Sequence, residues 1–168
     1  MKKLLCLILS LLFCVNFWGC QEEKPKLEQP VRFYYLTSTP ENGIQDKVID
    51  AVSVEGAGKL EDIHSLLNEY LRGTSEPGFE TTFPASTKIL KLTVSDSIAA
   101  VEMNSAIARL SGIDLTIACA CITMTVMELT GASQVRISAS NSTLDGAETV
   151  VMDINSLTML DIYTPEPT

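Results

Sequence analysis

The chain has 168 residues, of which 12 are basic and 21 acidic, and a formal net charge of −9 at pH 7. All 21 acidic residues and ten of the basic ones lie beyond Cys20, so this part carries a net charge of −11. A strongly acidic surface argues against a nucleic-acid-binding protein and against a domain that lies flat on anionic lipid.

The N-terminus has the pattern of an export signal. Two lysines precede an apolar run over residues 4–15, and the stretch ends in Phe17, Trp18, Gly19 and Cys20. An apolar core of roughly a dozen residues suits a secretory signal and is short for a membrane span. A small residue before a cysteine resembles a bacterial lipobox, although Phe17 and Trp18 depart from its usual aliphatic and small residues. We therefore predict a signal peptide over 1–19 and lipidation of Cys20; an uncleaved N-terminal anchor is the alternative, and both export the domain.

Residues 20–30 and 164–168 flank the predicted domain. The first segment is charged, contains two prolines and has one aliphatic residue, Leu27. Such a composition cannot form a core and suits a tether. The tail TPEPT is predicted to be disordered. Residues 31–163 remain, which is enough for one domain with its own core.

The first half of this domain begins with a strand. VRFYYLT, residues 31–37, is rich in β-branched and aromatic residues. TPENG is a predicted turn, and 47–56 is a second extended segment. Residues 59–73 form an amphipathic helix with apolar residues at spacings of three and four, and Gly73 is placed to cap its end in a left-handed conformation. A long connection follows over 74–87.

The second half alternates strands with one apolar helix. KILKLTV (88–94) and IAAVEM (98–103) alternate apolar and polar residues around a tight turn, which predicts a hairpin. We expect Leu90, Leu92 and Val94 on its inner face. QVRISAS (134–140) is a further strand, and ETVVMDI and LTMLDIY could add two more strands or packing segments. The order helix, strand, strand, helix, strand predicts an α+β two-layer sandwich with flanking N- and C-terminal strands, and the N-terminal strand could extend its sheet.

The stretch LSGIDLTIACACITMTVMELTG, residues 110–131, is the most apolar part of the domain. Its uncharged run covers only 13 residues between Asp114 and Glu128, whereas a membrane span needs about 20. Its apolar residues follow helical spacings, so we interpret it as a core helix that is partly covered on its far side. Ser111 and Asp114 resemble a capping box.

Two cysteines in this helix raise the question of a reactive or metal site. Cys119 and Cys121 would point about 200° apart on a helix, so they cannot share one metal ion. The chain has a single histidine, His64, and a zinc site would need two further ligands. Both thiols are interpreted as small packing groups.

The rest of the sequence contains no recognisable catalytic constellation. The carboxylates of Glu61, Asp62 and Glu69 lie on the solvated side of a predicted helix, and His64 is expected at its surface or in its packing. We therefore predict no enzymatic activity, no cofactor and no metal, and we favour a binding or assembly function.

The order of segments resembles the GerMN domain of bacterial sporulation and spore-germination lipoproteins. The resemblance rests on LLNEYLRG, FPAST, KILKLTVSDSIAAVEMN, the helix at 110–131 and SQVRISAS, roughly residues 59–140. Departures include Ala85 and Ser86 where Glu and Gly are common, and Ala120 where a polar residue is common.

The resemblance implies a lipid-anchored, extracytoplasmic, non-enzymatic module that assembles with envelope, sporulation or germination proteins, or with further copies of itself. An envelope hydrolase and an extracytoplasmic ligand-binding lipoprotein are the alternatives. The latter would need an apolar cleft between the helices and the C-terminal segment.

Overall fold

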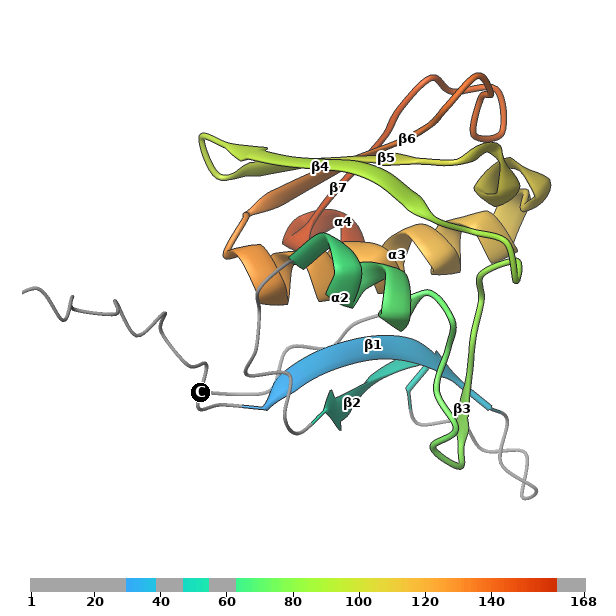
Figure 1. Ribbon diagram of the computed structural model, residues 1–168, viewed down its shortest axis with the longest axis vertical. Helices are drawn as coiled ribbons and strands as arrows, with labels where there is room; N and C mark the ends of the chain where they lie inside the picture. Colours follow the sequence, from blue (N-terminus) through green and yellow to red (C-terminus); the bar gives the residue numbers. More distant parts are fainter. Residues whose placement is uncertain (1–29, 39–46, 55–62, 160–168) are drawn as a thin grey trace, which may run out of the picture.

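The computed structural model describes residues 30–38, 47–54 and 63–159. These residues form two β-sheets with helices between them, so the molecule has three layers (Figure 1). The predicted signal peptide, Cys20, the tether and the C-terminal tail lie outside the described residues.

The larger sheet contains four strands in the order β4-β5-β6-β7. They are β4 (Ile89–Ser95), β5 (Ile98–Met103), β6 (Gln134–Ala139) and β7 (Val150–Asp153). β4 and β5 form the predicted hairpin around Asp96 and Ser97, which both have positive φ, as a two-residue type I′ turn requires. β5 and β6 are parallel, and their connection passes through the long helix, as a parallel crossover must.

The predicted inner faces of β5 and β6 are confirmed. Every second side chain of the two strands is buried against the helices: Ala99, Val101, Met103, Val135, Ile137 and Ala139. The prediction for β4 was wrong at Leu90, and Val94 is 48% exposed although it pairs with the buried Ala99. A β-bulge between Ile89 and Lys91 places Ile89 in the core and leaves Leu90 half exposed, because the extra residue interrupts the alternation of faces.

The long apolar stretch is confirmed as a core helix, α3 (Gly112–Thr130). By length and composition α3 could cross a membrane, but more than half of the stretch is buried inside the protein. The helix contacts the larger sheet on one side and β1 on the other, so its far side is covered as expected. It ends at Gly131, whose φ of 69° is left-handed and whose N–H bonds the Met127 carbonyl.

The predicted capping box at the start of α3 was wrong. Ser111 occupies the N-cap position but makes no side-chain capping bond. Gly112 has a φ of 57°, so the backbone turns before the helix starts. The Gly112 N–H instead donates to the carboxylate of Asp145 at 3.2 Å, and Asp145 lies in the loop between β6 and β7. The negative charge also suits the helix N-terminus.

Three shorter helical segments complete the fold. α2 (Ile63–Tyr70) is the described part of the first predicted helix, and Gly73 follows it with a φ of 93°. A 3₁₀ segment, η2 (Ser105–Arg109), precedes α3. The C-terminal segment forms β7 and then α4 (Ile154–Met159), so only the first of its two parts is a strand. Asp153 begins α4, since its carboxylate accepts the Ser156 N–H at 2.8 Å.

The N-terminal strands form a separate sheet, in the order β2-β1-β3. They are β1 (Val31–Thr37), β2 (Ile49–Val54) and the two-residue β3 (Phe79–Glu80). The expectation that the N-terminal strand extends the first sheet was therefore wrong. An apolar helix has two faces to cover, and β1 covers the one that the larger sheet leaves open.

The backbone edge of β1 is joined to the helices by side chains. The Tyr34 N–H donates to the Thr125 hydroxyl of α3 at 3.0 Å, and the Tyr70 hydroxyl of α2 donates to the Tyr34 carbonyl at 2.8 Å. Because β3 pairs only with Leu36 and Thr37, these two hydroxyls supply the partners that a neighbouring strand would otherwise give Tyr34.

The α+β class and the helix, strand, strand, helix, strand core are thus confirmed. The helices form one layer on the larger sheet, as predicted, and the flanking C-terminal strand joins that sheet as β7. The flanking N-terminal strands add the third layer.

Candidate functional site

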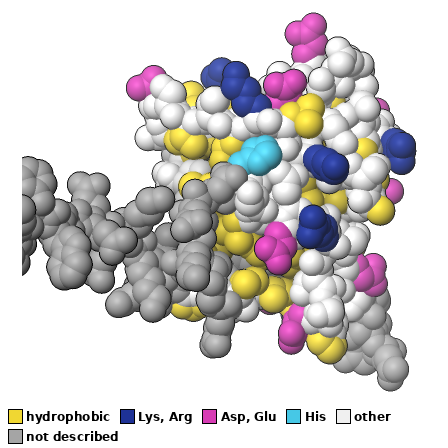
Figure 2. Space-filling model, in the orientation of Figure 1, with side chains coloured by type: hydrophobic (Ala, Val, Ile, Leu, Met, Phe, Trp, Pro, Cys, Tyr) yellow, Lys and Arg dark blue, Asp and Glu magenta, His cyan; other side chains and the backbone are white. Residues whose placement is uncertain are grey.

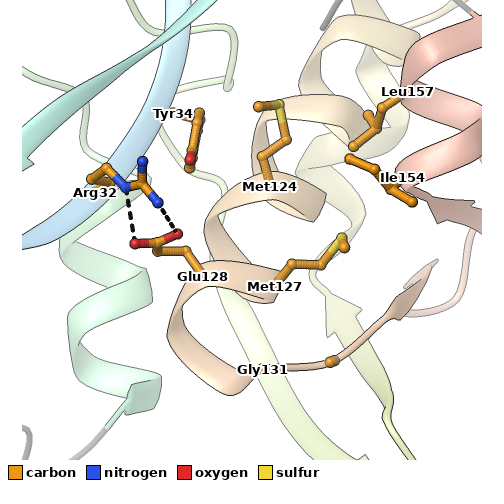
Figure 3. A pocket seen from close by; sticks show the side chains of 9 residues that line it. Arg32, Tyr34, Met124, Met127, Glu128, Gly131, Ile154 and Leu157 are labelled. Atoms are coloured by element: carbon orange, nitrogen blue, oxygen red, sulfur yellow. Dashed lines mark hydrogen bonds and ion pairs between the residues drawn. The ribbon is translucent and has the colours of Figure 1, made fainter. Parts of the chain in front are cut away.

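A hollow of about 250 Å³ opens where β1, the C-terminal half of α3 and α4 meet (Figure 3). We call it the β1–α3–α4 pocket. Nine residues line it: Arg32, Tyr34, Met124, Met127, Glu128, Gly131, Ala132, Ile154 and Leu157. It lies between a helix and the C-terminal segment, where an apolar cleft was expected for a ligand-binding protein.

The positions of these side chains follow from local structure. Met124, Met127 and Glu128 are spaced by three and four residues, so they share one face of α3. Arg32 and Tyr34 alternate with the buried residues Val31, Phe33 and Tyr35 along β1 and therefore point away from them.

The apolar wall of the pocket is deepest at its base. Leu157 is 1% exposed and Met124 7%, whereas Ile154 at the rim is 43% exposed. Methionine side chains are flexible and polarizable, so they adapt to apolar groups of different shapes. The wall can therefore receive an apolar side chain without a fixed shape requirement.

The polar wall is an ion pair. The Arg32 guanidinium donates to both Glu128 carboxylate oxygens, at 3.0 and 2.9 Å, and Figure 3 shows this fork at one side of the pocket. Glu128 lies near the C-terminal end of α3, where the helix dipole disfavours a negative charge, and Arg32 offsets it. The Arg32 side chain is 53% exposed, so the pair adds at most about 1 kcal/mol to stability, and its polar atoms are accessible to a partner.

The two helix cysteines lie away from this pocket and are confirmed as packing residues. Cys119 and Cys121 are 1% and 0% exposed. Burial raises the pKa of both thiols to about 12, so neither forms the thiolate that nucleophilic chemistry needs. Both point into protein because α3 is covered by a sheet on each side.

The other candidate residues do not come together. His64 is half-buried on α2, with its Nδ1 3.4 Å from the Asn68 amide. Glu69 is exposed, as expected, whereas Glu61 and Asp62 lie outside the described residues. Among the residues that the structure describes, no three His, Cys, Asp or Glu side chains are grouped so as to hold a metal ion.

Charged side chains of both signs are mixed on one face of the molecule. On the face drawn in Figure 2, acidic and basic side chains are interspersed among small apolar areas. A nucleic-acid-binding face would instead gather Lys and Arg in a stripe or patch.

The pocket was not predicted residue by residue. An acid in the last turn of α3 could have pointed to a basic partner, but no local signal identifies Arg32, which is 96 positions away in the sequence. In the sequence, Met124 and Met127 look like ordinary core residues, because the position of α4 beside them cannot be inferred from local patterns.

Comparisons with known proteins agree with this architecture. A family model described as "Germane: Sporulation and spore germination" matches residues 32–145. The structure is similar to the first GerMN domain of the Bacillus subtilis sporulation protein GerM, at 15% identity and a TM-score of 0.52, over 74% of this chain and 94% of that one. It is also similar to the tandem GerMN domains of the same protein, at 20% identity and a TM-score of 0.51, over 77% of this chain.

This chain spans about half the length of the tandem structure, 47%. A candidate lipoprotein from Clostridium perfringens is matched at 20% identity and a TM-score of 0.45, over 79% of this chain and 93% of that one. No curated protein matches the chain. The family match covers more than half of the chain, so the chain belongs to the Germane family of sporulation and spore-germination domains.

Proposed function

We propose that the protein is a lipid-anchored, extracytoplasmic module that binds other envelope proteins during sporulation or spore germination and catalyses no reaction. The family membership supports the process, and the N-terminal pattern ending in Cys20 supports the anchor. The observation that carries the binding function is the β1–α3–α4 pocket, with an apolar base and an accessible charged fork.

The dimensions of the pocket favour a partner protein. Sites for small ligands are enclosed and usually hold about 300–1,000 Å³, whereas this hollow is open and holds about 250 Å³. That volume suits one apolar side chain of a partner, with a neighbouring polar group placed against Arg32 or Glu128. An apolar anchor in a pocket with a polar rim is the usual centre of a protein interface.

The tether restricts where such a partner can be. Eleven residue steps separate Cys20 from Val31, and an extended chain spans at most about 3.6 Å per residue. β1 would therefore remain within roughly 40 Å of the lipid anchor, and the pocket, which contains Arg32, would face partners that are also near the membrane.

The extracytoplasmic binding of a small amphipathic ligand is the second candidate, and the same pocket favours it. A ligand there would place its apolar part against Met124 and Leu157, and its charged group would contact the Arg32–Glu128 ion pair.

One experiment separates these functions. A photoactivatable phenylalanine analogue replaces Ile154 at the pocket rim, and the matched control carries it at Ile113, which is 67% exposed at the other end of α3. We expect the first variant to crosslink to a membrane or envelope protein in sporulating cells and the control to yield no such product. Equal crosslinking at both positions, or none at either, would refute pocket-mediated assembly. Failure of Ile154 to crosslink together with retention of a small molecule by the purified protein would favour the ligand-binding function.

A further inference from the structure

The β1–α3–α4 pocket lies at the carboxyl end of α3, which is the negative end of the helix. The helix ends at Thr130, and Gly131 just beyond it lines the pocket. The Gly131 N–H donates to the Met127 carbonyl, but no hydrogen bond between described residues is accepted by the next three carbonyls, those of Glu128, Leu129 and Thr130. Such unpaired carbonyl groups give a helix end about half a negative charge.

The side chains around the pocket do not neutralise this end. The last turn of α3 contains no basic residue. Of the nine residues that line the pocket, Arg32 is the only cation and Glu128 the only anion, so their two charges cancel. The helix end therefore leaves the pocket with an excess of about half a negative charge. The chain's net charge of −9 adds a general attraction for cations.

The apolar wall leads from the rim of the pocket to this negative end. Figure 3 shows Met127 between Ile154 on one side of the pocket and Glu128 on the other. An aliphatic stem that crosses Met127 would therefore carry a charged tip from the rim to Glu128. Lysine is built in this way, because its methylene stem packs along apolar surface while its ammonium group stays with polar groups.

We propose that the pocket receives a lysine side chain of the partner protein. Its stem lies on Met127, and its ammonium group lies between the Glu128 carboxylate and the carbonyl end of α3. The inference rests on the proposed binding function and adds the chemistry of the group that is bound.

The geometry of the ion pair favours lysine over arginine. Arg32 donates to both Glu128 oxygens, at 3.0 and 2.9 Å, and so occupies the carboxylate edge that a second guanidinium would need for a two-point contact. Each oxygen keeps a further lone pair, which a compact ammonium group can use together with a helix carbonyl. The Glu128 side chain is 28% exposed, so it can be reached. A carboxylate from a partner would meet Glu128 and the negative helix end, which disfavours an acidic side chain.

The methyl signals of methionine can report binding at this pocket. The full chain is purified in detergent micelles with isotope-labelled methionine methyl groups, and its NMR spectrum is titrated with the N-acetyl N′-methylamides of lysine, norleucine, arginine and 2-aminoadipate. Norleucine keeps the lysine stem without the ammonium group, and 2-aminoadipate ends in a carboxylate. The four probes therefore separate the contribution of the stem from that of the charge and its shape.

We expect the lysine derivative to shift the Met124 and Met127 signals and to bind about fivefold more tightly than each other probe, the factor that a partly exposed ion pair and a helix end together provide. Met103 is 0% exposed in the core and is the internal control, whose signal should not move. Equal affinity for norleucine, tighter binding of the arginine or aminoadipate derivative, or no shift with any probe would overturn the proposal.

Two variants then locate the charge that selects lysine. Glu128→Gln removes the carboxylate and keeps its size, so the preference for lysine over norleucine should fall to within about twofold. Arg32→Gln removes the cation that competes for Glu128, so the lysine derivative should bind more tightly than it does to the parent. Weaker lysine binding by Arg32→Gln, or an undiminished preference in Glu128→Gln, would contradict the proposal. An unchanged Met103 signal shows that each variant is folded.

The crosslinking experiment at Ile154 separates this inference from the proposed function. If Ile154 captures an envelope protein but the lysine derivative shows no preference, the partner binds through other chemistry and only this inference fails. If the lysine derivative binds selectively but Ile154 captures no protein, the charge selectivity of the pocket stands and the proposed function fails.

Discussion

The hydrogen bonds that join β1 to the helices should be energetically coupled. The perturbations are Tyr70→Phe, which removes only a hydroxyl, and Thr125→Val, which replaces a hydroxyl by a methyl of similar size. Both side chains are buried, with Tyr70 1% and Thr125 0% exposed. Tyr70→Phe leaves the Tyr34 carbonyl without its donor, and Thr125→Val leaves the Tyr34 N–H without its acceptor.

The size of each effect follows from these contacts. An unsatisfied buried polar group costs about 1–3 kcal/mol, so each single substitution should lower the free energy of unfolding by that amount. Both hydroxyls bond the same residue, Tyr34, from two elements that pack on it, so the first substitution already disturbs what the second removes. We expect the double variant to lose less than the sum of the single losses, by at least about 0.5 kcal/mol.

Equilibrium urea unfolding, followed by far-UV circular dichroism, measures these free energies. Thr158→Val on the exposed side of α4 is the control for the same substitution, and we expect it to stay within about 0.5 kcal/mol of the parent. Strict additivity of Tyr70→Phe and Thr125→Val, or a neutral Tyr70→Phe, would refute the network as the connection between the two halves of the fold.

Three further predictions concern pH, the thiols and the helix ends. Burial raises the pKa of Tyr35, Cys119 and Cys121 to about 12, so from about pH 9 upward the folded state binds more protons than the unfolded state, and the free energy of unfolding should fall with rising pH. In the double variant Cys119→Ala, Cys121→Ala, urea titrations at stepped pH should show this decline starting nearer pH 10. An unchanged onset would contradict the prediction. Cys119→Ser should destabilise more than Cys119→Ala, because this side chain is 1% exposed and a buried hydroxyl without a partner adds a desolvation cost. Both free thiols should react with an alkylating reagent only after unfolding, as followed by mass spectrometry; fast labelling of the native protein would show that they are accessible. Asp145→Ala should cost about 0.5–2 kcal/mol by removing the bond to Gly112 at the start of α3, measured by thermal unfolding against Asp145→Asn, which keeps an acceptor and should lose less.

The parts of the fold that could be predicted are those with a local pattern. Alternation identified the buried faces of β5 and β6, and helical spacing with Gly131 identified α3 as a core helix. A β-bulge has no comparable signal, so Leu90 was placed on the wrong face. The two-residue β3 and the short α4 were missed because segments of this length depend on tertiary contacts more than on propensity.

The contacts between residues far apart in the sequence are the part of the fold and of the pocket that could not be predicted. The residues 31–37 indicate a strand, but nothing local shows which sheet it joins. The Tyr34 to Thr125 bond that fixes β1 beneath α3 joins residues 91 positions apart. Arg32 and Glu128 likewise meet only after both layers are formed. Cys20 remains a prediction, since it lies outside the described residues.

The N-terminus offers the most direct test of a membrane-anchored assembly module. The measurement is the intact mass of the protein extracted from membranes, with fragmentation to locate any modification. We predict a mature chain that begins at Cys20 and carries a diacylglyceryl group on that thiol. A chain that retains residues 1–19, or one that begins with an unmodified Cys20, would contradict it.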